Sequence, residues 1–326
     1  MKDHRSIMLE LQKTHDVIYD LLKGQPFHYT DIPMHDNIGD LLIMQGTLAF
    51  FKKKGLSPKT TSTASGFDPS WVEPGDILVF HGGGNFGDLY TNINDLREDI
   101  ITRFPNNRIV MMPQTIFFSS EAKRDRSASI FRRHPDVHIF IRDRVSQGIA
   151  RLFSDHVYLV PDMAHQLYPI ASTGSGTGVL RIERVDVEAP QVPQSLKDLR
   201  FDTRTDWVEV IGTEKRFIDF AWRLECKFRA HRWDVLQKRL GPWYWVPMAQ
   251  RFSNKAIDLF SVHDHIVTDR LHGHILSCLM DKKNTVIDNS YGKNSTYINE
   301  WTGNSDLVQL VKAEANPEAE TCASPT

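Results

Sequence analysis

Short apolar runs alternate along this chain with longer segments of helical periodicity, and this alternation constrains the fold more than any other feature. The apolar runs predict buried strands at residues 77–80, 108–112, 137–141 and 157–160. Helical patterns are found at residues 7–22, 40–54, 88–104, 119–134 and 143–153. Strands that alternate with helices are typical of βα units around a parallel sheet. The expected fold class is therefore α/β.

A stretch of small residues with three glycines, residues 171–178, interrupts this pattern and is typical of a flexible connection between domains. Beyond it, the pattern predicts strands at 179–182, 263–268 and 285–288, and helices from about Gly273 and Ser295. A chain of 326 residues suffices for two domains of about 150 residues each. We expect an N-terminal domain at 1–172, a linker at 173–178, a C-terminal domain at 179–314 and a disordered tail at 315–326.

Two segments in the second half of the chain are less regular. Residues 183–206 are polar, charged and interrupted by Pro190 and Pro193, which predicts a mobile loop. Residues 217–252 are rich in aromatic side chains, with basic residues interleaved. Burial in a core helix pair explains this aromatic block, while sugar stacking and contact with a membrane surface are the open alternatives.

The charge balance disfavours one broad class of function. The chain has 39 Lys and Arg against 41 Asp and Glu, a net charge of −2, which argues against a dedicated nucleic-acid binder. Cys226, Cys278 and Cys322 are too widely spaced for a disulfide framework and indicate reduced thiols. The first residues hold no apolar signal segment, and the most apolar run is about half the length needed to cross a bilayer. We therefore expect a cytoplasmic protein without a membrane anchor.

Two glycine-containing motifs carry polar groups that could bind a ligand. In HDNIGDLLI, residues 35–43, a helix is expected from about Asp40, and Asp40 is either its cap or a ligand-binding group beside Asn37 and Gly39. In HGGGNFGDLY, residues 81–90, the glycines match the dinucleotide pattern GxGxxG between a strand and a helix.

A dinucleotide is nevertheless disfavoured at the second motif. A dinucleotide site needs an acidic residue at the end of the next strand, where Met112, Pro113 and Gln114 stand instead. Asn85 and Asp88 also add polar groups that do not suit a pyrophosphate cradle. We therefore expect a tight glycine turn before a helix.

Two positively charged residues follow predicted strands. Arg142 follows the strand 137–141 at the sheet edge where open α/β folds bind ligands, and its planar fork suits a carboxylate or a phosphate. A structural salt bridge to Asp143 or to a neighbouring residue is the alternative. Arg270 lies beside His272 at the start of a predicted helix, a pairing that suits anion binding together with proton transfer.

A metal site has to be considered in this second region, because four histidines fall within twelve residues: His263, His265, His272 and His274. The HxxxH and HExxH spacings of metal sites are missing. No metal is therefore expected.

Taken together, these motifs resemble the polysaccharide pyruvyl transferase family. The matching segments, spread over about 260 residues, are NIGD at 37–40, HGGGNFGD at 81–88, MPQT at 112–115, Arg142, PDMAHQL at 161–167, LRIE at 180–183, TDRLHGH at 268–274 and DNSYGKN at 288–294. The resemblance implies two Rossmann-like domains facing each other across a cleft, as in GT-B glycosyltransferases. It also implies that phosphoenolpyruvate donates its pyruvyl group to a sugar as a cyclic ketal, with release of phosphate and without a further cofactor.

The acceptor implied by the resemblance is a sugar of an exopolysaccharide or of its lipid-linked precursor. A lipid-linked acceptor would bring the enzyme to the cytoplasmic face of the inner membrane as a peripheral protein. The acceptor sugar and the oligomeric state stay open.

The resemblance also implies roles for individual residues. Arg270 and His272 take the catalytic Arg-Leu-His positions, and Arg142 is similar to the arginine that helps to hold the donor. The further substrate-binding residues that we predict are Asn37, Gly39, Asp40, Gly83, Gly84, Asn85, Asp88, Gln114, Leu271, Lys293 and Asn294. Independently of the family, phosphoenolpyruvate needs cationic or amide-rich anchors, and His272 is placed to protonate its methylene carbon. The base that activates the sugar hydroxyl is left open among Asp40, Asp88 and His81.

Two other functions fit the same pattern. A nucleotide-sugar-dependent glycosyltransferase of GT-B type would use a carboxylate such as Asp288 or Glu300 for the ribose, but would leave the Arg-Leu-His cluster without a purpose. A non-catalytic glycan- or anion-binding protein would need only the glycine motifs.

Overall fold

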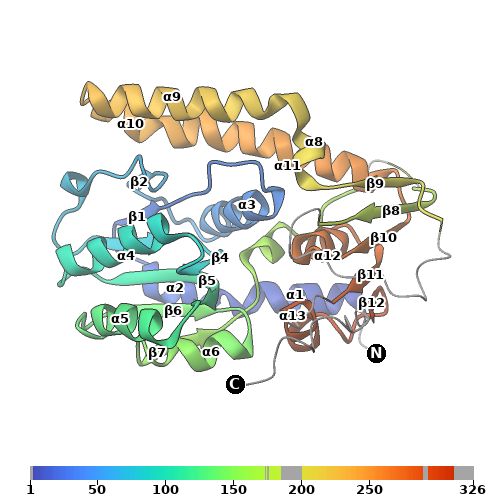
Figure 1. Cartoon of the computed structure of the whole chain (residues 1–326), viewed down its shortest axis with the longest axis horizontal. Helices are drawn as coiled ribbons and strands as arrows, with labels where there is room; N and C mark the ends of the chain where they lie inside the picture. The colour runs from blue at the N-terminus through green and yellow to red at the C-terminus, as the bar shows by residue number, and fades with distance from the viewer. Residues whose placement is uncertain (1–2, 173, 175, 185–199, 289–292, 312–326) are drawn as a thin grey trace, which may run out of the picture. The chain divides into compact units, whose positions relative to one another are not determined.

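The computed structural model describes residues 3–172, 174, 176–184, 200–288 and 293–311. The chain forms two compact units (Figure 1). The N-terminal unit contains Leu9–Tyr168 and Ile211–Asn254, and the C-terminal unit contains Met1–Met8, Pro169–Val210 and Lys255–Thr326. The chain therefore enters and leaves the N-terminal unit twice.

A parallel sheet forms the centre of the N-terminal unit. Its strand order is β2-β1-β3-β5-β6-β7, and β4 also pairs with β5. The strands are β1 (Phe27–Thr30), β2 (Thr60–Thr61), β3 (Ile77–Phe80), β4 (Gly83–Gly87), β5 (Ile109–Phe117), β6 (Val137–Ile141) and β7 (His156–Leu159). Every residue of β1, β3 and β6 is buried, because helices cover both faces of the sheet.

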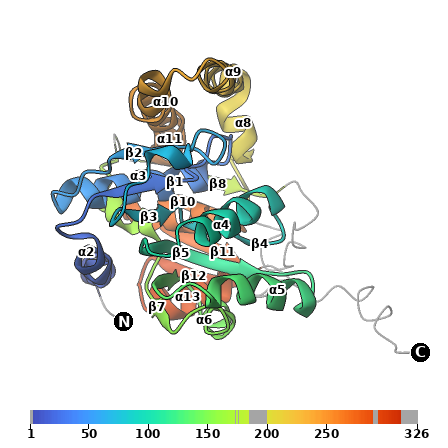
Figure 2. The same cartoon turned by 90° about the vertical axis from the view of Figure 1, so that its left-hand side faces the viewer.

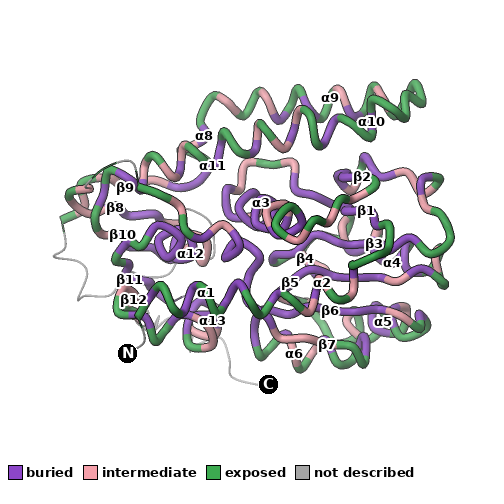
Figure 3. Tube along the Cα trace, turned by 180° about the vertical axis from the view of Figure 1, so that it is seen from behind, coloured by how far each residue is buried: buried purple, intermediate pink, exposed green. Residues whose placement is uncertain are grey.

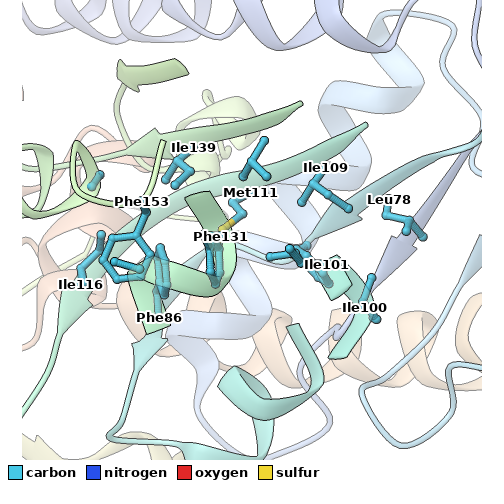
Figure 4. Close-up of a cluster of buried hydrophobic side chains, with 14 of the residues drawn as sticks. Leu78, Phe86, Ile100, Ile101, Ile109, Met111, Ile116, Phe131, Ile139 and Phe153 are labelled. Carbon is cyan, nitrogen blue, oxygen red and sulfur yellow. The ribbon is translucent and has the colours of Figure 1, made fainter. Parts of the chain in front are cut away.

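Helices α2 and α3 lie on one side of this sheet, and α4 and α5 lie on the other (Figure 2). The helices of the first half are α1 (His4–Thr14), α2 (Asp16–Leu22), α3 (Ile38–Lys53), α4 (Thr91–Arg103), α5 (Glu121–Arg132) and α6 (Arg144–Ala150), with 3-10 turns η1 (Pro69–Trp71) and η2 (Met163–Leu167). Phe86 of β4 packs against Phe131 and Phe153, with ring centroids 5.3 and 5.1 Å away, in the core beneath α4 and α5 (Figure 4).

The aromatic block forms helices, but several of its largest side chains are exposed. The segment contains α8 (Trp207–Ile211), η3 (Gly212–Lys215), α9 (Arg216–Ala230), α10 (Asp234–Leu240), the π-helical turn η4 (Gly241–Trp245) and α11 (Val246–Ser261). Trp245 is buried and donates a hydrogen bond to the Pro33 carbonyl, whereas Trp222, Trp233 and Trp243 are exposed. The expectation of a core helix pair is therefore correct for one face of the block only.

A second parallel sheet forms the C-terminal unit, with the strand order β12-β11-β10-β8-β9. Its strands are β8 (Val179–Ile182), β9 (Thr203–Thr205), β10 (His265–Thr268), β11 (Lys283–Ile287) and β12 (Val308–Val311), and its helices include α12 (Leu271–Leu279) and α13 (Lys293–Trp301). The start of α1 belongs to this unit, because the His4 ring bonds to Ser305 Oγ at 2.7 Å and to the Cys278 carbonyl at 2.9 Å. The expected α/β class with parallel sheets is confirmed.

The division of the chain differs from the expected one in the aromatic block. Residues 211–254 belong to the N-terminal unit, because Glu225 accepts a hydrogen bond from Thr63 Oγ1 at 2.5 Å and another from Ser65. Gly176, inside the expected linker, packs so closely on the His263 backbone that a Cβ there would lie 2.3 Å from its carbonyl. The expected tail at 315–326 lies outside the described residues.

Two local expectations are wrong. Residues 83–87 form β4 instead of a tight turn, and the next helix begins at Thr91, because this segment pairs with β5. Residues 203–205 of the expected loop form β9, which pairs with β8, while 185–199 lie outside the described residues. No helix within the described ranges is long and apolar enough to cross a membrane.

Candidate functional site

Arg142 lies at the carboxyl end of β6 and is held by a buried carboxylate. Its Nη1 donates to Asp162 Oδ2 at 2.5 Å, and its Nε donates to Thr115 Oγ1 at 2.9 Å. The Asp162 side chain is fully buried, and that of Arg142 is 7% exposed. Asp143 instead caps α6 by accepting the Ser146 N–H at 2.7 Å, so the salt bridge of Arg142 is to Asp162 and not to Asp143.

The glycine segment runs directly beside Arg142. A Cβ on Gly84 would lie 3.6 Å from Arg142 Nη2, and a Cβ on Gly83, which has φ of +111°, would lie 3.3 Å from Asp40 Oδ1. A Cβ on Gly87 would lie 1.7 Å from the Phe117 carbonyl, which shows why this position in β4 lacks a side chain. The glycines therefore bring one backbone strand close to both Asp40 and Arg142.

A buried ion pair fixes the start of the glycine segment. Asp31 accepts hydrogen bonds from Arg97 Nε at 2.9 Å and from Arg97 Nη2 at 2.6 Å, and both side chains are fully buried. Asp31 also accepts the His81 N–H at 2.5 Å, and Arg97 Nη2 donates to Asn85 Oδ1 at 3.0 Å. Asn85 is therefore a partner of this ion pair. No local sequence pattern indicates this pair, because its members are 66 residues apart.

Two buried polar side chains near the glycine segment, His81 after β3 and Gln114 within β5, have unused hydrogen-bonding atoms. His81 Nδ1 lies 2.6 Å from the Tyr29 hydroxyl, and Gln114 Nε2 donates to the His81 carbonyl. Within the described part of the chain, His81 Nε2 and Gln114 Oε1 have no hydrogen-bond partner. Burial lowers the pKa of His81 to about 3, so its imidazole is neutral near neutral pH. Gln114 is tied to Arg142 through its carbonyl, which accepts the Arg142 N–H at 3.1 Å.

Asp40 lies in the first turn of α3 without capping it. Asn37 is the cap, because its Oδ1 accepts the Gly39 N–H at 3.1 Å. Asn37 Nδ2 donates to Asp40 Oδ2 at 2.9 Å, and His35 Nε2 lies 3.5 Å from the same oxygen. The Asp40 side chain is 25% exposed, which makes it the accessible carboxylate beside Gly83.

Asp88 is held away from this group. It lies five residues beyond Gly83, beyond the end of β4, or about 15 Å along an extended strand. Its carboxylate accepts the Ser119 N–H at 2.8 Å and pairs with Lys123 Nζ at 3.0 Å. Burial opposes ionisation, but these hydrogen bonds prevail and lower the pKa of Asp88 to about 2. The structure therefore brings Asp40, Gly83, Gly84, Asn85, Gln114 and Arg142 together and leaves Asp88 outside.

In the C-terminal unit, Arg270 is held by a carboxylate in the same way. Its Nε and Nη2 donate to the two oxygens of Asp206 at 3.0 and 2.5 Å, and Asp206 is 2% exposed. Arg270 is the N-cap residue of α12, and the helix begins with Leu271 and His272, both partly exposed. The guanidinium and the imidazole thus lie within the first turn of one helix. Asp206 was missed because it lies 64 residues from Arg270 in an irregular segment.

A second buried ion pair lies directly before Arg270. Arg181 of β8 donates from Nη2 to Asp269 Oδ2 at 3.0 Å, and Asp269 Oδ1 accepts the Arg184 N–H at 2.9 Å. Burial raises the pKa of Asp269 to about 6 despite the neighbouring Arg181. The sequence signal for Arg181 was a single charge inside the apolar run of β8.

Of the two remaining predicted residues of this unit, Asn294 has a structural contact. Asn294 Nδ2 donates to the carbonyls of Asp269 at 2.8 Å and Ile287 at 3.2 Å, which joins the ends of β10 and β11. Lys293 begins α13, and its side chain lies outside the described residues.

The other histidines of the cluster separate. His263 contacts Thr203, His265 contacts Thr285, and His274 contacts Asn284 and Thr302. Among the described residues, no group of three or more His, Cys, Asp or Glu is placed to hold a metal ion.

Comparison with known proteins identifies the family. The sequence model of the polysaccharide pyruvyl transferase family matches residues 37–291. The chain is 36% identical to "Putative pyruvyl transferase EpsO" of Bacillus subtilis (strain 168), over 97% of this chain and 98% of that protein. It is 30% identical to "Pyruvyl transferase 1" of Schizosaccharomyces pombe, over 69% of this chain and 54% of that protein.

A solved structure agrees at the level of the fold. An uncharacterized protein of Klebsiella pneumoniae superposes with a TM-score of 0.60 at 20% identity, covering 92% of this chain and 98% of that one. The family match extends over both units and includes all of the segments that carry the resemblance, from NIGD onward, except the last three residues of DNSYGKN. The chain belongs to the polysaccharide pyruvyl transferase family.

Proposed function

We propose that this protein transfers the pyruvyl group of phosphoenolpyruvate onto a sugar of an exopolysaccharide or of its lipid-linked precursor, forming a cyclic ketal and releasing phosphate. The observation that carries the proposal is the first turn of α12, where Arg270, fixed by two hydrogen bonds to Asp206, stands two residues before His272. A fixed cation beside a titratable imidazole suits an anionic substrate that must be protonated on carbon.

The donor chemistry requires an acid and anion anchors. In the proposed mechanism, His272 donates its proton to C3 of phosphoenolpyruvate, which makes C2 electrophilic. A sugar hydroxyl forms a bond to C2 and gives its proton to a base, and the C2–O bond to phosphate breaks. A second hydroxyl then forms a bond to C2 and gives its proton to the departing phosphate, which closes the ketal. Arg270 and Arg142 are the anchors for the carboxylate and the phosphate, and their charge supports the reaction without a further cofactor or metal.

The structure favours Asp40 among the three candidate bases. The pKa of His81, lowered to about 3 by burial, makes its imidazole a weak base, although His81 Nε2 and Gln114 Oε1 can still hydrogen-bond a ligand. Asp88 is occupied by Ser119 and Lys123. Asp40 is partly exposed beside Gly83, so we propose that it accepts the proton of the attacking hydroxyl.

The arrangement of two Rossmann-like domains across a cleft, as in GT-B glycosyltransferases, is part of the proposal. The two parallel sheets support it at the level of each unit. A crystal structure with bound phosphoenolpyruvate tests it, since contacts from both Arg142 and Arg270 to one donor molecule are expected.

Phosphate release from phosphoenolpyruvate, with and without a panel of glycan acceptors, tests the function. We expect acceptor-dependent release and a mass gain of about 70 Da on the acceptor, the increment for one pyruvyl ketal. Transfer from a nucleotide sugar without phosphate release would instead establish the glycosyltransferase alternative. Glycan binding without turnover on any donor would establish a binding protein.

A further inference from the structure

The helical hairpin formed by α9 and α10 concentrates positive charge. Residues 215–243 contain eight Lys or Arg and three Asp or Glu, a net charge of +5 in a chain whose total is −2. One of the three acids, Glu225, is buried and bonded to Thr63 and Ser65, so Asp219 and Asp234 are the exposed ones. The hairpin therefore presents a strongly basic surface on a protein that is nearly neutral overall.

The same hairpin exposes large apolar side chains. The exposed fractions are 49% for Phe220, 57% for Trp222, 43% for Trp233, 44% for Leu236 and 67% for Trp243. Single exposed apolar residues are normal on protein surfaces, but a group of them together marks an interaction surface. Figure 3 shows how exposed and buried positions alternate along α9 and α10.

Basic and apolar residues share one face of each helix. On α9, Arg216, Phe220, Arg223 and Lys227 follow the spacing i, i+4, i+7 and i+11, which places them along one stripe. On α10 and η4, residues 236, 239 and 243 follow a similar spacing. The two helices lie side by side, and the Phe220 ring contacts the Tyr244 ring at 5.6 Å, which joins the two stripes (Figure 1).

We call the residues of these two stripes the hairpin surface: Arg216, Phe220, Arg223, Lys227, Leu236, Arg239 and Trp243. The opposite face of α9, with Ala221 and Glu225, is buried against the N-terminal unit. All seven residues of the hairpin surface are exposed.

Cationic groups of the hairpin lie over aromatic rings. The Arg239 guanidinium is 4.3 Å from the centroid of the Trp243 ring, and Lys227 Nζ is 5.8 Å from that of Trp233. Aromatic rings beside long basic side chains suit a boundary between apolar and aqueous media, because the rings enter the boundary while the charges stay hydrated. Basic amphipathic helices with Trp, Phe and Leu bind in the headgroup region of anionic membranes in this manner.

We propose that the hairpin surface binds an anionic lipid bilayer. The charge complementarity selects acidic lipids, and the exposed Phe220, Leu236 and Trp243 supply apolar contact with the acyl boundary. This inference goes beyond the pyruvyl transfer reaction and concerns residues outside its proposed site. Only its biological meaning, access to a lipid-linked sugar at the membrane surface, rests on the proposed function.

Vesicle co-sedimentation of the full-length protein tests the proposal. We expect binding to phosphatidylcholine vesicles that contain phosphatidylglycerol, little binding to phosphatidylcholine alone, and loss of binding as salt rises.

The double variant Arg223→Glu/Arg239→Glu is expected to bind anionic vesicles at least tenfold more weakly. The variant Phe220→Ser/Trp243→Ser is expected to weaken binding as well. A matched control is Arg5→Glu/Lys13→Glu, which makes the same charge change at exposed positions of α1 and should bind normally.

Several results would overturn the proposal. One is equal binding to both kinds of vesicle, and another is an equal loss of vesicle binding in the control variant. The third is a protein that binds no vesicles but is retained on a soluble polyanionic glycan. Thermal melts verify that each variant is folded. Phosphate release with a soluble acceptor should be unchanged in the hairpin variants. If neither the parent protein nor any variant releases phosphate but vesicle binding is as expected, the proposed reaction is wrong and the membrane-binding proposal is still supported.

Discussion

Arg142 and Arg270 are each fixed by a carboxylate that is almost fully buried. Asp162 has no exposed side-chain surface, and Asp206 is 2% exposed. A buried carboxylate that bonds to one edge of a guanidinium fixes the orientation of the arginine side chain. Such a side chain loses little conformational entropy when the guanidinium binds an anion. The same arrangement thus holds Arg142 in the N-terminal unit and Arg270 in the C-terminal unit.

The roles of acid and anchor can be separated by substitution at α12. His272→Ala is expected to lower kcat by a factor of about 100 to 10,000 with little change in phosphoenolpyruvate affinity, because only the proposed proton donor is lost. Arg270→Ala is expected to weaken donor binding at least tenfold. Steady-state phosphate release and donor titration measure both effects. The exposed His231→Ala is the control, and full turnover in His272→Ala would place the acid elsewhere.

His274 makes the stability of the C-terminal unit depend on pH. Its ring contacts Asn284 Oδ1 at 2.7 Å and Thr302 Oγ1 at 2.8 Å, and burial lowers its pKa from 6.5 to about 4. Below pH 6.5 the unfolded chain binds a proton that the folded unit does not accept until about pH 4. The free energy of unfolding should therefore fall as pH decreases through this window, by about 1.4 kcal/mol per pH unit for this group.

Urea unfolding at several pH values measures this contribution. His274→Gln removes the titrating group, so its free energy of unfolding should be lower near neutral pH but should change less between pH 6.5 and 4. His231→Gln, at an exposed position, should keep the slope of the parent protein. An unchanged slope in His274→Gln would mean that another group takes up the proton.

At the scale of elements, the sequence predicted the continuously apolar strands well and the strands that contain polar residues or glycines poorly. The runs at 77–80 and 137–141 coincide with β3 and β6, since strands buried on both faces are continuously apolar. β1 contains His28 and Thr30, and β4 has three glycines in five residues, so neither has a strong local signal. Both strands form because neighbouring strands supply their hydrogen bonds, a tertiary effect that local propensity does not contain.

The site was predicted to a similar extent. Arg142 follows β6 and Arg270 precedes α12, as predicted, because strand ends and helix starts can be located from the chain itself, whereas the glycine segment forms β4 instead of the predicted turn. Their partners Asp162 and Asp206, and the pair Asp31 and Arg97, were not found, because they come from distant segments that only the folded sheet brings together.

Close packing of α3 on η2 depends on a glycine. A Cβ on Gly46 would lie 2.1 Å from the Met163 carbonyl oxygen, whereas a Cβ on Gly148 of α6 would meet no atom within 4 Å. Gly46→Ala is therefore expected to lower the free energy of unfolding by about 1–3 kcal/mol. Gly148→Ala should raise it by up to about 1 kcal/mol through helix propensity alone. Chemical denaturation of both variants measures the difference, and equal stabilities would show that η2 moves away without cost.

At the scale of the whole molecule, the beginning of the chain belongs to the unit that also contains its end. His4, 5% exposed, bonds to Ser305 and to the carbonyl of Cys278. His4→Ala is expected to destabilise the C-terminal unit by about 1–3 kcal/mol, because two buried hydrogen bonds are lost. Hydrogen exchange should accelerate in α12 and β11 and not in β5 or β6. The neighbouring exposed Arg5→Ala should change neither, and faster exchange in both units would indicate that they unfold together.

This interleaving of the chain sets an order for folding during synthesis. The N-terminal unit has all its residues once position 254 has left the ribosome, whereas the sheet of the C-terminal unit still needs β10, β11 and β12, at 265–311. Translation proceeds from the N-terminus, and units fold as they are completed. His4 must therefore wait for its partners Cys278 and Ser305, which are made after the N-terminal unit is complete. A ribosome stalled before position 308 would carry one finished sheet and one in which β11 lacks its partner β12.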